Sequence, residues 1–222
     1  MKNQLLLHIG DWAINKETLE AAKASLSGIK DFAVSHGELD LQALPLEKVI
    51  SEPLKEVYTV PVFTETFCKI LLDEITNAEF IPNDSEDELR QIPEYILNVK
   101  NPALYDSLMK VVMSILNPIF YTIWQQVAFA GNIQVANYNP KGKQKGAWHH
   151  DASSDITVVV PLNTGSYQGG GTEFYKRGKL DPLPNGTALI FPAMTHLHRG
   201  LAVEDGDRFL LVFWLKCNQR EI

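Results

Sequence analysis

The chain has 222 residues, of which 45% are hydrophobic and 21% charged, and its formal net charge is −7. This composition is ordinary for a globular protein with one full core, and we expect no membrane span. The negative charge argues against a nucleic-acid-binding surface. The N-terminal apolar stretch is too short for a signal peptide, and two cysteines, Cys68 and Cys217, are too few for a disulfide framework. The sequence therefore predicts a cytoplasmic protein.

Residues 1–52 are predicted to form a small N-terminal appendage, beside a main domain over residues 53–222. Within the appendage, the apolar run 5–9 could be a strand, and residues 16–29 have the composition of a helix. His8 and His36 also lie there, each far from the other histidines. An isolated histidine is more often a packing or surface residue, so neither is predicted to bind metal.

Two helical regions follow in the main domain. Over residues 63–75, Phe67, Leu71 and Ile75 recur at helical spacing behind Thr64, a plausible N-cap. The acidic stretch 83–95 is predicted to be a solvated loop.

The second helical region begins where Pro102 follows a candidate cap, Asn101. Its apolar stripe runs through Leu104, Leu108, Val111 or Val112, and Ile115. Pro118 is expected to end or kink this helix, and a further helix can run through Trp124. We expect these helices to cover the outer face of a sheet.

After Gly131 the pattern changes to short apolar runs separated by turn residues. Strands are predicted over 133–138, 156–163, 172–178, 185–193, 198–203 and 207–216. Gly165 and the run Gly169 to Gly171 suit turns with positive φ. A protein that is mainly β with flanking helices, built as a sandwich or jelly roll, is the predicted fold class.

The stretch WHHDASSDITVVVPLN contains the first candidate metal ligands, His149 and Asp151, at the mouth of a predicted strand. Residues i and i+2 of a strand point to the same face, so an imidazole and a carboxylate lie side by side. His198 follows 47 residues after Asp151. Two histidines and one carboxylate leave positions open on an iron(II) ion, as non-haem oxygenases require. Ten residues after His198, Arg208 could bind a carboxylate in bidentate fashion.

Other assignments of the histidines compete with this set. Strand alternation turns His150 to the opposite face, whereas His196 shares a face with His198, and periodicity alone cannot separate these two. A structural zinc site usually has four protein ligands, often cysteines. A catalytic zinc site would want a general base and would not need Arg208.

These residues resemble the iron(II)- and 2-oxoglutarate-dependent dioxygenases, and in particular the catalytic domain of procollagen lysyl hydroxylases, with prolyl 4-hydroxylases as more distant relatives. The similar features are HHDAS, ITVVVPLN, YQGGGTEF, GTALIFPAMTHLH and GDRFLLVFW, within residues 56–217. The resemblance implies a double-stranded β-helix (jelly-roll) core, iron(II) held by His149, Asp151 and His198, and 2-oxoglutarate as co-substrate. It further implies that Arg208 holds the distal carboxylate of 2-oxoglutarate, with Tyr138 or Thr157 as helpers. Ascorbate is a candidate for an additional cofactor.

The family pattern favours His198 over His196, and for Tyr138 simple packing is an equal alternative. Phe174, Phe191 and Phe213 are candidates for shielding the site from water. The lysine-containing loop 139–146 is predicted to be a solvated hairpin, with a lid or substrate contact as the alternative.

The resemblance implies hydroxylation of an amino-acid side chain in a protein, peptide or amino-acid substrate. Peptidyl lysine is the first choice, and prolyl or free amino-acid hydroxylation the alternative. Asp155 and Glu173 could receive a cationic side chain, although for each of them a solvated surface position is slightly favoured. A jelly-roll binding module with a vestigial metal site is the non-enzymatic alternative, and a homodimer is compatible with the sequence.

Overall fold

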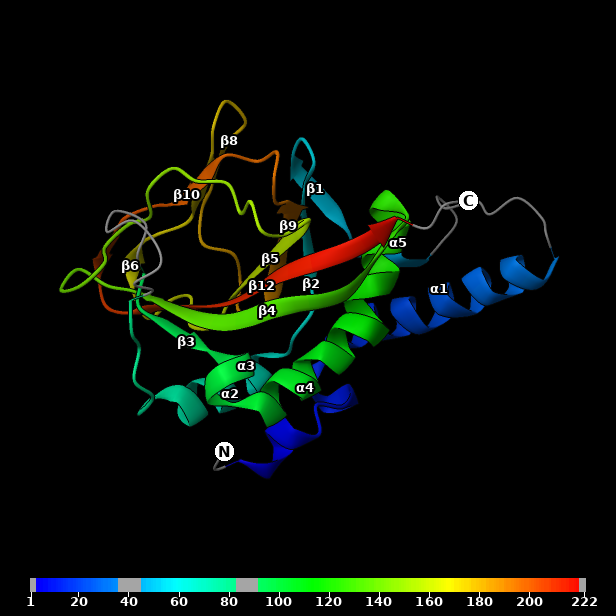
Figure 1. Ribbon diagram of the computed structural model, residues 1–222, viewed down its shortest axis with the longest axis horizontal. Helices are drawn as coiled ribbons and strands as arrows, with labels where there is room; N and C mark the ends of the chain where they lie inside the picture. Colours follow the sequence, from blue (N-terminus) through cyan, green and yellow to red (C-terminus); the bar gives the residue numbers. More distant parts are fainter. Residues whose placement is uncertain (1–2, 36–44, 83–91, 220–222) are drawn as a thin grey trace.

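The computed structural model describes residues 3–35, 45–82 and 92–219. Its largest element is a seven-stranded antiparallel sheet with the strand order β1-β2-β9-β5-β12-β4-β3. Two smaller sheets, β10-β7-β8 and β11-β6, lie on the side of this sheet away from the helices (Figure 1). His149 forms a β-bridge with His198, which adds one more segment to the edge of the three-stranded sheet. The predicted jelly-roll core is confirmed.

The strands of the large sheet are β1 (Ser51–Leu54), β2 (Val57–Pro61), β3 (Glu94–Ile96), β4 (Gln126–Tyr138), β5 (Ile156–Pro161), β9 (Thr187–Pro192) and β12 (Arg208–Gln219). The strands of the smaller sheets are β6 (Gln168–Gly169), β7 (Thr172–Phe174), β8 (Gly178–Leu180), β10 (His198–Gly200) and β11 (Val203–Asp205). The last of these strands in the chain, β12, lies between β5 and β4 near the middle of the large sheet.

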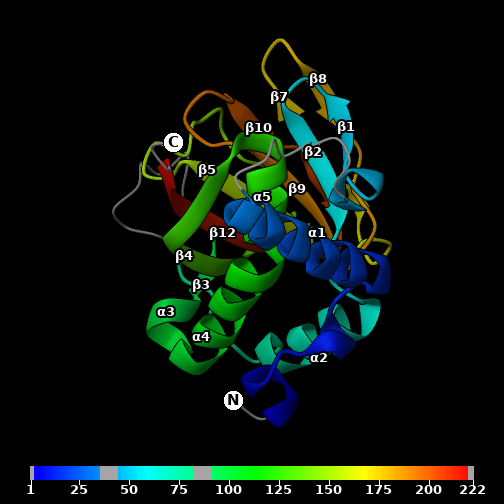
Figure 2. The same cartoon turned by 90° about the vertical axis from the view of Figure 1, so that its right-hand side faces the viewer.

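Helices cover the outer face of the large sheet, as predicted (Figures 1 and 2). They are α1 (Lys16–Ser35), α2 (Glu65–Ile75), α3 (Leu97–Lys100), α4 (Pro102–Val111) and α5 (Asn117–Trp124), with a π-helical segment η5 (Val112–Leu116) between the last two. Both predicted caps are present: the Thr64 hydroxyl accepts from the Phe67 amide at 3.1 Å, and the Asn101 side chain accepts from the Leu104 amide at 3.3 Å. The apolar stripe of α4 is buried in the core between helices and sheet.

Pro118 does not end the second helix. The preceding π-helical turn widens the helix just before it, so the helix runs on through residue 124 although proline lacks the amide needed for the usual hydrogen bond. This continuous helix, Pro102–Trp124, is long and apolar enough to cross a membrane by length and composition, which the sequence reading did not anticipate. In the fold, 56% of its most apolar window is buried, as is typical of a core helix.

The described part of the N-terminal segment packs into the same core as the large sheet. Leu6, Ala13 and Leu46 are fully buried in it. The Asn15 amide donates to the Val62 carbonyl at 2.8 Å, beyond the end of β2. The predicted helix is present as α1, but the predicted strand at 5–9 is wrong, because residues 4–7 form a 3-10 helix, η1 (Gln4–Leu7). Two further 3-10 turns are η2 (Asp11–Ala13) and η4 (Pro45–Lys48).

The predicted strand over 172–178 is two strands joined by a tight turn at Tyr175–Arg177, where Lys176 has φ +58°. Sequence patterning missed this turn because it contains neither glycine nor proline. The glycine run before it does adopt positive φ, and a Cβ on Gly171 would lie 2.4 Å from the Leu180 carbonyl oxygen. His36 and most of the acidic stretch 83–95 lie outside the described residues.

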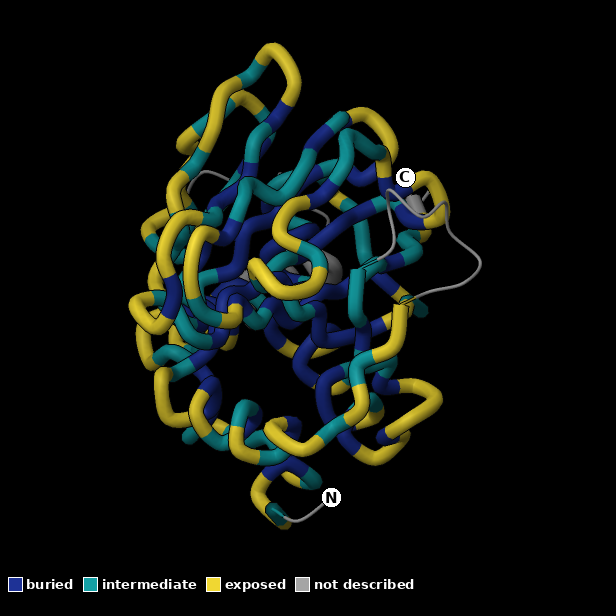
Figure 3. The backbone as a smooth tube through the Cα atoms, turned by 90° about the vertical axis from the view of Figure 1, so that its left-hand side faces the viewer, coloured by how far each residue is buried: buried dark blue, intermediate teal, exposed yellow. Residues whose placement is uncertain are grey.

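Buried residues are concentrated in the sheets and in the helix segments that face them, whereas exposed residues lie mainly in the connecting loops (Figure 3). The loop 139–146 is largely exposed, and its Lys141 and Lys145 face solvent.

Candidate metal centre

His149, Asp151 and His198 come together at the inner edge of the smaller sheets. One potential ligand atom from each lies within 4.8 Å of the others. Nε2 of His149 is 3.4 Å from Oδ1 of Asp151, and Nε2 of His198 is 3.7 Å from Oδ2 of the same carboxylate. His149 and His198 are held side by side by their β-bridge, whereas Asp151 follows on a loop before β5. The geometry is that of a three-ligand face, although His149 and Asp151 do not lie on a regular strand as predicted.

The remaining ring nitrogen of each histidine is already engaged. Nδ1 of His149 donates to the Ala147 carbonyl and Nδ1 of His198 donates to the His196 carbonyl, both at 2.9 Å. Because a carbonyl oxygen only accepts, Nδ1 carries the proton and Nε2 keeps its lone pair. Burial lowers the pKa of His198 to about 4, so its ring is neutral at pH 7. Each Nε2 atom can therefore donate its lone pair to a metal ion.

Asp151 is ready to act as an anionic ligand. Burial raises the pKa of its carboxyl, but the neighbouring His149 and His198 rings and the hydrogen bond from Thr157 together hold the pKa below its ordinary value. The Thr157 hydroxyl donates to Oδ2 at 2.6 Å. Thr157 therefore contacts the candidate metal ligand directly, and its predicted contact with 2-oxoglutarate stays a prediction.

His196 lies outside the group of three. Its ring packs against Phe174 and Phe191, and its Nδ1 is 3.0 Å from the Thr195 hydroxyl oxygen. Burial, and then the charge of Arg177, lowers its pKa. His150 is exposed and lies at the rim of the adjoining cavity, not on the opposite face as strand alternation predicted, because this segment is not a regular strand.

A cavity of about 420 Å³ opens beside the three ligands. Its floor is the inner face of the large sheet, where β5, β12, β4 and β3 lie side by side. The inward-facing residues of these strands are Thr157, Val159, Arg208, Leu210, Val212, Trp214, Gln134, Ala136, Tyr138 and Glu94. Alternate residues such as Leu211 and Phe213 point instead into the helix-covered core. Phe213 is therefore not a shield of the site, whereas Phe174 and Phe191 do pack against the His198 ring.

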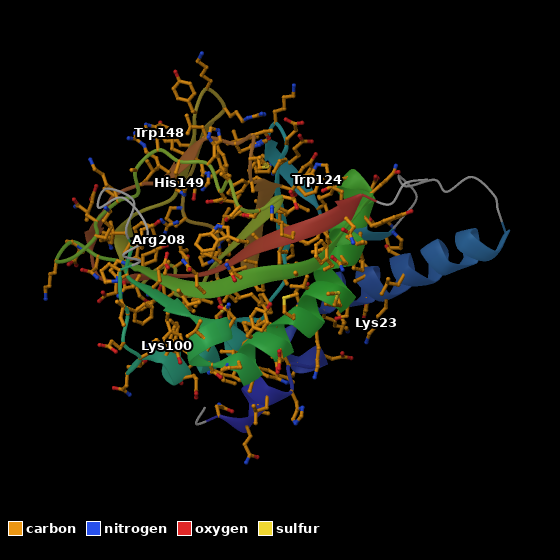
Figure 4. The ribbon with its side chains drawn as sticks, viewed as in Figure 1. Lys23, Lys100, Trp124, Trp148, His149 and Arg208 are labelled. Carbon is orange, nitrogen blue, oxygen red and sulfur yellow. The ribbon has the colours of Figure 1, made fainter. Side chains whose placement is uncertain are left out.

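Arg208 lines this cavity at the start of β12 (Figure 4). Only 3% of its surface is exposed, and its Nε and Nη1 atoms are buried without a hydrogen-bond partner in the described part of the chain. A buried guanidinium with unsatisfied donors is costly unless an anion completes it. Tyr138 lies beside it, with the guanidinium carbon 5.7 Å from the ring centroid. In Figure 4, His149 and Arg208 lie on the cavity side of the large sheet, whereas Lys23 and Lys100 lie on the helical side.

The two acids predicted as receivers of a cation are engaged elsewhere. Asp155 accepts from the Cys217 amide at 2.9 Å and lies 3.9 Å from the Lys216 ammonium, and Glu173 pairs with Arg199 at 2.6 Å. Neither lines the cavity. The acid that does, besides Asp151, is Glu94, which sequence reasoning assigned to a solvated loop. The signal that could have found it is its position between Ile92 and Ile96, two apolar residues that share its face in a strand.

The sequence is similar to procollagen lysine hydroxylases, although no protein-family profile matches it. It is 24% identical over 182 residues to a multifunctional procollagen lysine hydroxylase and glycosyltransferase of Caenorhabditis elegans, covering 76% of this chain and 25% of that protein. It is 28% identical over 183 residues to procollagen-lysine,2-oxoglutarate 5-dioxygenase 1 of Mus musculus, and the match covers 74% of this chain and 24% of that protein. The chain thus matches about a quarter of the length of these curated relatives.

Solved structures with a similar fold include several hydroxylases. A prolyl-4-hydroxylase of Pseudomonas putida has a TM-score of 0.57 at 14% identity, covering 72% of this chain and 92% of that one. A viral collagen prolyl hydroxylase of Paramecium Bursaria Chlorella virus-1, in complex with 2-oxoglutarate, has a TM-score of 0.53 at 19% identity, covering 72% and 95%. A prolyl hydroxylase of Trichoplax adhaerens has a TM-score of 0.58 at 11% identity, covering 90% and 91%. By sequence the chain is a homologue of the procollagen lysine hydroxylases, and its fold is the jelly roll of the 2-oxoglutarate/iron(II) oxygenases.

Proposed function

We propose that this protein is an iron(II)- and 2-oxoglutarate-dependent dioxygenase that hydroxylates an amino-acid side chain, with peptidyl lysine as the first candidate substrate. The observation that carries the proposal is the pairing, in one cavity, of a three-ligand His-Asp-His face with a buried arginine whose Nε and Nη1 have no hydrogen-bond partner among the described residues. The procollagen lysine hydroxylase relatives support lysine, and the neighbouring structures, several of which are prolyl hydroxylases, make proline the alternative.

The donor set fits iron(II). Two neutral imidazoles and one carboxylate on one face are the ligands of non-haem iron oxygenases, and they leave the opposite positions open. A structural zinc would need a fourth protein ligand. Among the described histidines, cysteines and acids, only His149, Asp151 and His198 form such a group.

The cavity also fits 2-oxoglutarate, which is a dianion. The Arg208 guanidinium would bind the distal carboxylate, because its buried donors match a carboxylate in bidentate geometry. Thr157 holds Asp151 in place, and the apolar residues Val159, Leu210 and Val212 line the cavity between polar ends. These residues limit the access of water to the reacting groups.

With iron(II) bound, the site would couple the oxidative decarboxylation of 2-oxoglutarate to hydroxylation: the substrate C–H, dioxygen and 2-oxoglutarate give the alcohol, succinate and carbon dioxide. The protein's part is to position and shield the reactants, and the metal carries the oxidation chemistry. A binding module with a vestigial site would have no need of the unpaired buried arginine.

The test is a screen for succinate release by purified protein with iron(II), 2-oxoglutarate and dioxygen, over lysyl peptides, prolyl peptides and free amino acids. We expect succinate and a hydroxylated product in equal amounts, with about one oxygen atom added to the product per turnover. Oxygen found on proline alone would move the substrate assignment to the alternative. Failure to bind 2-oxoglutarate in the presence of iron(II) would refute the oxygenase proposal itself.

We also propose a reducing, cytoplasmic location. Both cysteines are free thiols, which supports it, and burial raises the pKa of each to about 12, so both are protonated at neutral pH.

A further inference from the structure

An open groove of about 620 Å³ adjoins the cavity that contains the metal ligands. The groove is lined by the cationic side chains of Lys55, Lys176 and Arg177, and Tyr175 forms part of its wall. His150 lines both the groove and the cavity, so the two spaces meet at this residue. Among the described residues that line the groove there is no carboxylate. We call this surface the basic groove.

Two turns from different sheets form one side of the basic groove. Lys55 lies in the turn between β1 and β2 of the large sheet, and residues 175–177 form the turn between β7 and β8. The two turns lie side by side (Figure 2). Arg177 joins them, because its Nη1 donates to the Lys55 carbonyl at 2.9 Å and its Nη2 lies 3.2 Å from a carboxylate oxygen of Glu56. These contacts hold the groove wall in shape although both turns are exposed.

Each of these turns contains a non-glycine residue with a left-handed backbone. The φ angle is +58° at both Glu56 and Lys176. Side chains other than glycine adopt this region rarely and at an energetic cost, and such residues are frequent at binding sites. Lys176 is exposed, and its ammonium lies 5.3 Å from the centre of the Tyr175 ring. Backbone geometry alone would favour glycine at this position, whereas an anionic ligand in the groove accounts for a lysine.

Two of the cations in the basic groove are open to a ligand. Lys55 and Lys176 are both exposed, and neither forms an ion pair with a described residue, whereas Arg177 is paired with Glu56. The whole chain carries a net charge of −7, so this local concentration of positive charge differs in sign from the rest of the molecule. An acidic segment is therefore attracted to the groove and repelled by much of the remaining surface.

An aromatic rim connects the basic groove to the metal ligands. Trp148 directly precedes His149, and its ring contacts that of Tyr175 edge to face, with centroids 5.7 Å apart. The Arg199 guanidinium lies 4.5 Å from the Trp148 ring centre and adds a cation to the rim. In Figure 4, Trp148 lies next to His149, toward the turn between β7 and β8. A polypeptide with one side chain at the metal centre can extend across this rim into the groove, which a free amino acid is too short to do.

We propose that the basic groove binds an acidic segment of a polypeptide substrate, close in sequence to the residue that is hydroxylated. This inference rests on the proposed oxygenase function and narrows its substrate class to proteins or peptides with acidic residues near the target side chain. Lys55 and Lys176 supply the charge, and Arg177 holds the two turns together. A nucleic acid is disfavoured, because its phosphates would also meet the negative remainder of the surface.

The experiment uses fluorescein-labelled lysyl peptides that carry a pair of glutamates at increasing distances on either side of the target lysine. Each peptide has a matched partner with glutamines in place of the glutamates. Binding is measured by fluorescence anisotropy with iron(II) and 2-oxoglutarate and without dioxygen, so that no turnover occurs. At one or more placements, we expect the glutamate peptide to bind about 3- to 10-fold more tightly than its partner at low salt, as for two exposed ion pairs. The difference should shrink at high salt, because exposed charges are screened.

In the double variant Lys55→Glu with Lys176→Glu this preference should disappear, while the glutamine peptides and 2-oxoglutarate bind as before. The matched control is Lys69→Glu with Lys100→Glu, which changes the net charge equally at exposed lysines of α2 and α3, on the helical side of the large sheet. The control should keep most of the preference. If the groove variant does not fold, as judged by its melting curve, Lys55→Gln with Lys176→Gln should still lose most of the preference.

Equal binding of every glutamate peptide and its glutamine partner, or an equal loss in the groove variant and the control, would overturn the inference. Tighter binding of a single-stranded oligonucleotide or of phosphatidylserine vesicles than of the glutamate peptides, lost in the groove variant, would also overturn it. Failure of the oxygenase proposal looks different. In that case 2-oxoglutarate does not bind to the unmodified protein or to either double variant, whereas the preference for the glutamate peptides persists.

Discussion

At the scale of single residues, the metal centre depends on groups that orient the ligands. Each candidate histidine ligand donates from Nδ1 to a carbonyl oxygen two residues before it, and the carboxylate accepts from Thr157. Such partners fix which ring nitrogen faces the metal, and losing one typically weakens metal binding 10- to 100-fold, roughly.

His149→Ala and His198→Ala should each abolish turnover and sharply weaken iron(II) binding, because two ligands cannot hold the ion in the same geometry. His196→Ala and His150→Ala should keep most of both, since these rings lie outside the group of three. Anaerobic metal titration of the four variants decides the matter. Loss of iron in His196→Ala with retention in His198→Ala would reverse the assignment.

Thr157→Val should weaken iron(II) binding by about 10-fold or more, because Oδ2 of Asp151 loses its 2.6 Å hydrogen bond. At saturating iron, the apparent constant for 2-oxoglutarate should not change. Thr122→Val is the control, since that buried hydroxyl donates to the Pro118 carbonyl within α5, far along the chain from the site. A raised 2-oxoglutarate constant at saturating iron would show instead that Thr157 contacts the co-substrate, as the sequence suggested.

Arg208→Lys should raise the apparent constant for 2-oxoglutarate by about 10-fold or more and leave iron(II) affinity nearly unchanged. A lysine supplies one ammonium where the guanidinium supplies a planar pair of donors. Separate titrations of iron and 2-oxoglutarate measure the two effects. An equal loss of iron binding would mean that Arg208 supports the structure of the metal centre.

At the scale of elements, local sequence signals predicted most of the fold. Thr64 and Asn101 marked helix starts, the apolar stripe of α4 marked its buried face, and the motif residues 149, 151, 198 and 208 converge as expected. The failures have physical causes. The turn at 175–177 uses a lysine at positive φ, and Pro118 is tolerated because a π-helical turn precedes it.

The place of Glu94 in the cavity wall was missed for a different reason. Glu94 follows a strongly charged stretch, and composition alone assigns such a stretch to solvent. Only the pairing of β3 with β4 turns this side chain inward, and strand pairing between distant segments is not contained in a local pattern.

Gly171→Ala should destabilise the protein by about 2–4 kcal/mol, because φ is +105° there and the new Cβ would lie 2.4 Å from the Leu180 carbonyl oxygen. Gly165→Ala is the matched control: φ is +94°, but nothing lies within 4 Å of its Cβ position. It should cost only the backbone strain, about 1 kcal/mol. Urea unfolding of both variants measures the difference. Equal costs would show that the glycine-rich segment before β7 relaxes around the methyl group.

At the scale of the whole molecule, the described N-terminal residues share the core of the main domain. Ser107 on α4 donates to the Leu7 carbonyl at 2.8 Å, and α1 packs beside α5 (Figure 2). That residues 1–52 form a separate appendage stays a prediction. Stability measurements can test this prediction.

Leu6→Ala should lower the free energy of unfolding by about 2–5 kcal/mol, because this side chain is fully buried in the common core. Leu5→Ala, at a side chain that is 50% exposed, should change it by about 0.5 kcal/mol or less. Urea or thermal unfolding followed by circular dichroism gives both values in one cooperative transition. A separate early transition in Leu6→Ala, with the main transition unmoved, would instead support an independent appendage.

The central position of β12 has a consequence for synthesis. This strand begins at Arg208, yet it separates β5 from β4 and pairs with both. Until the ribosome has released it, β4 and β5 lack their common partner, and their unpaired edges are open to other chains. We therefore expect nascent chains stalled before Arg208 to require chaperone protection, and the metal centre to form only after translation has passed this last strand.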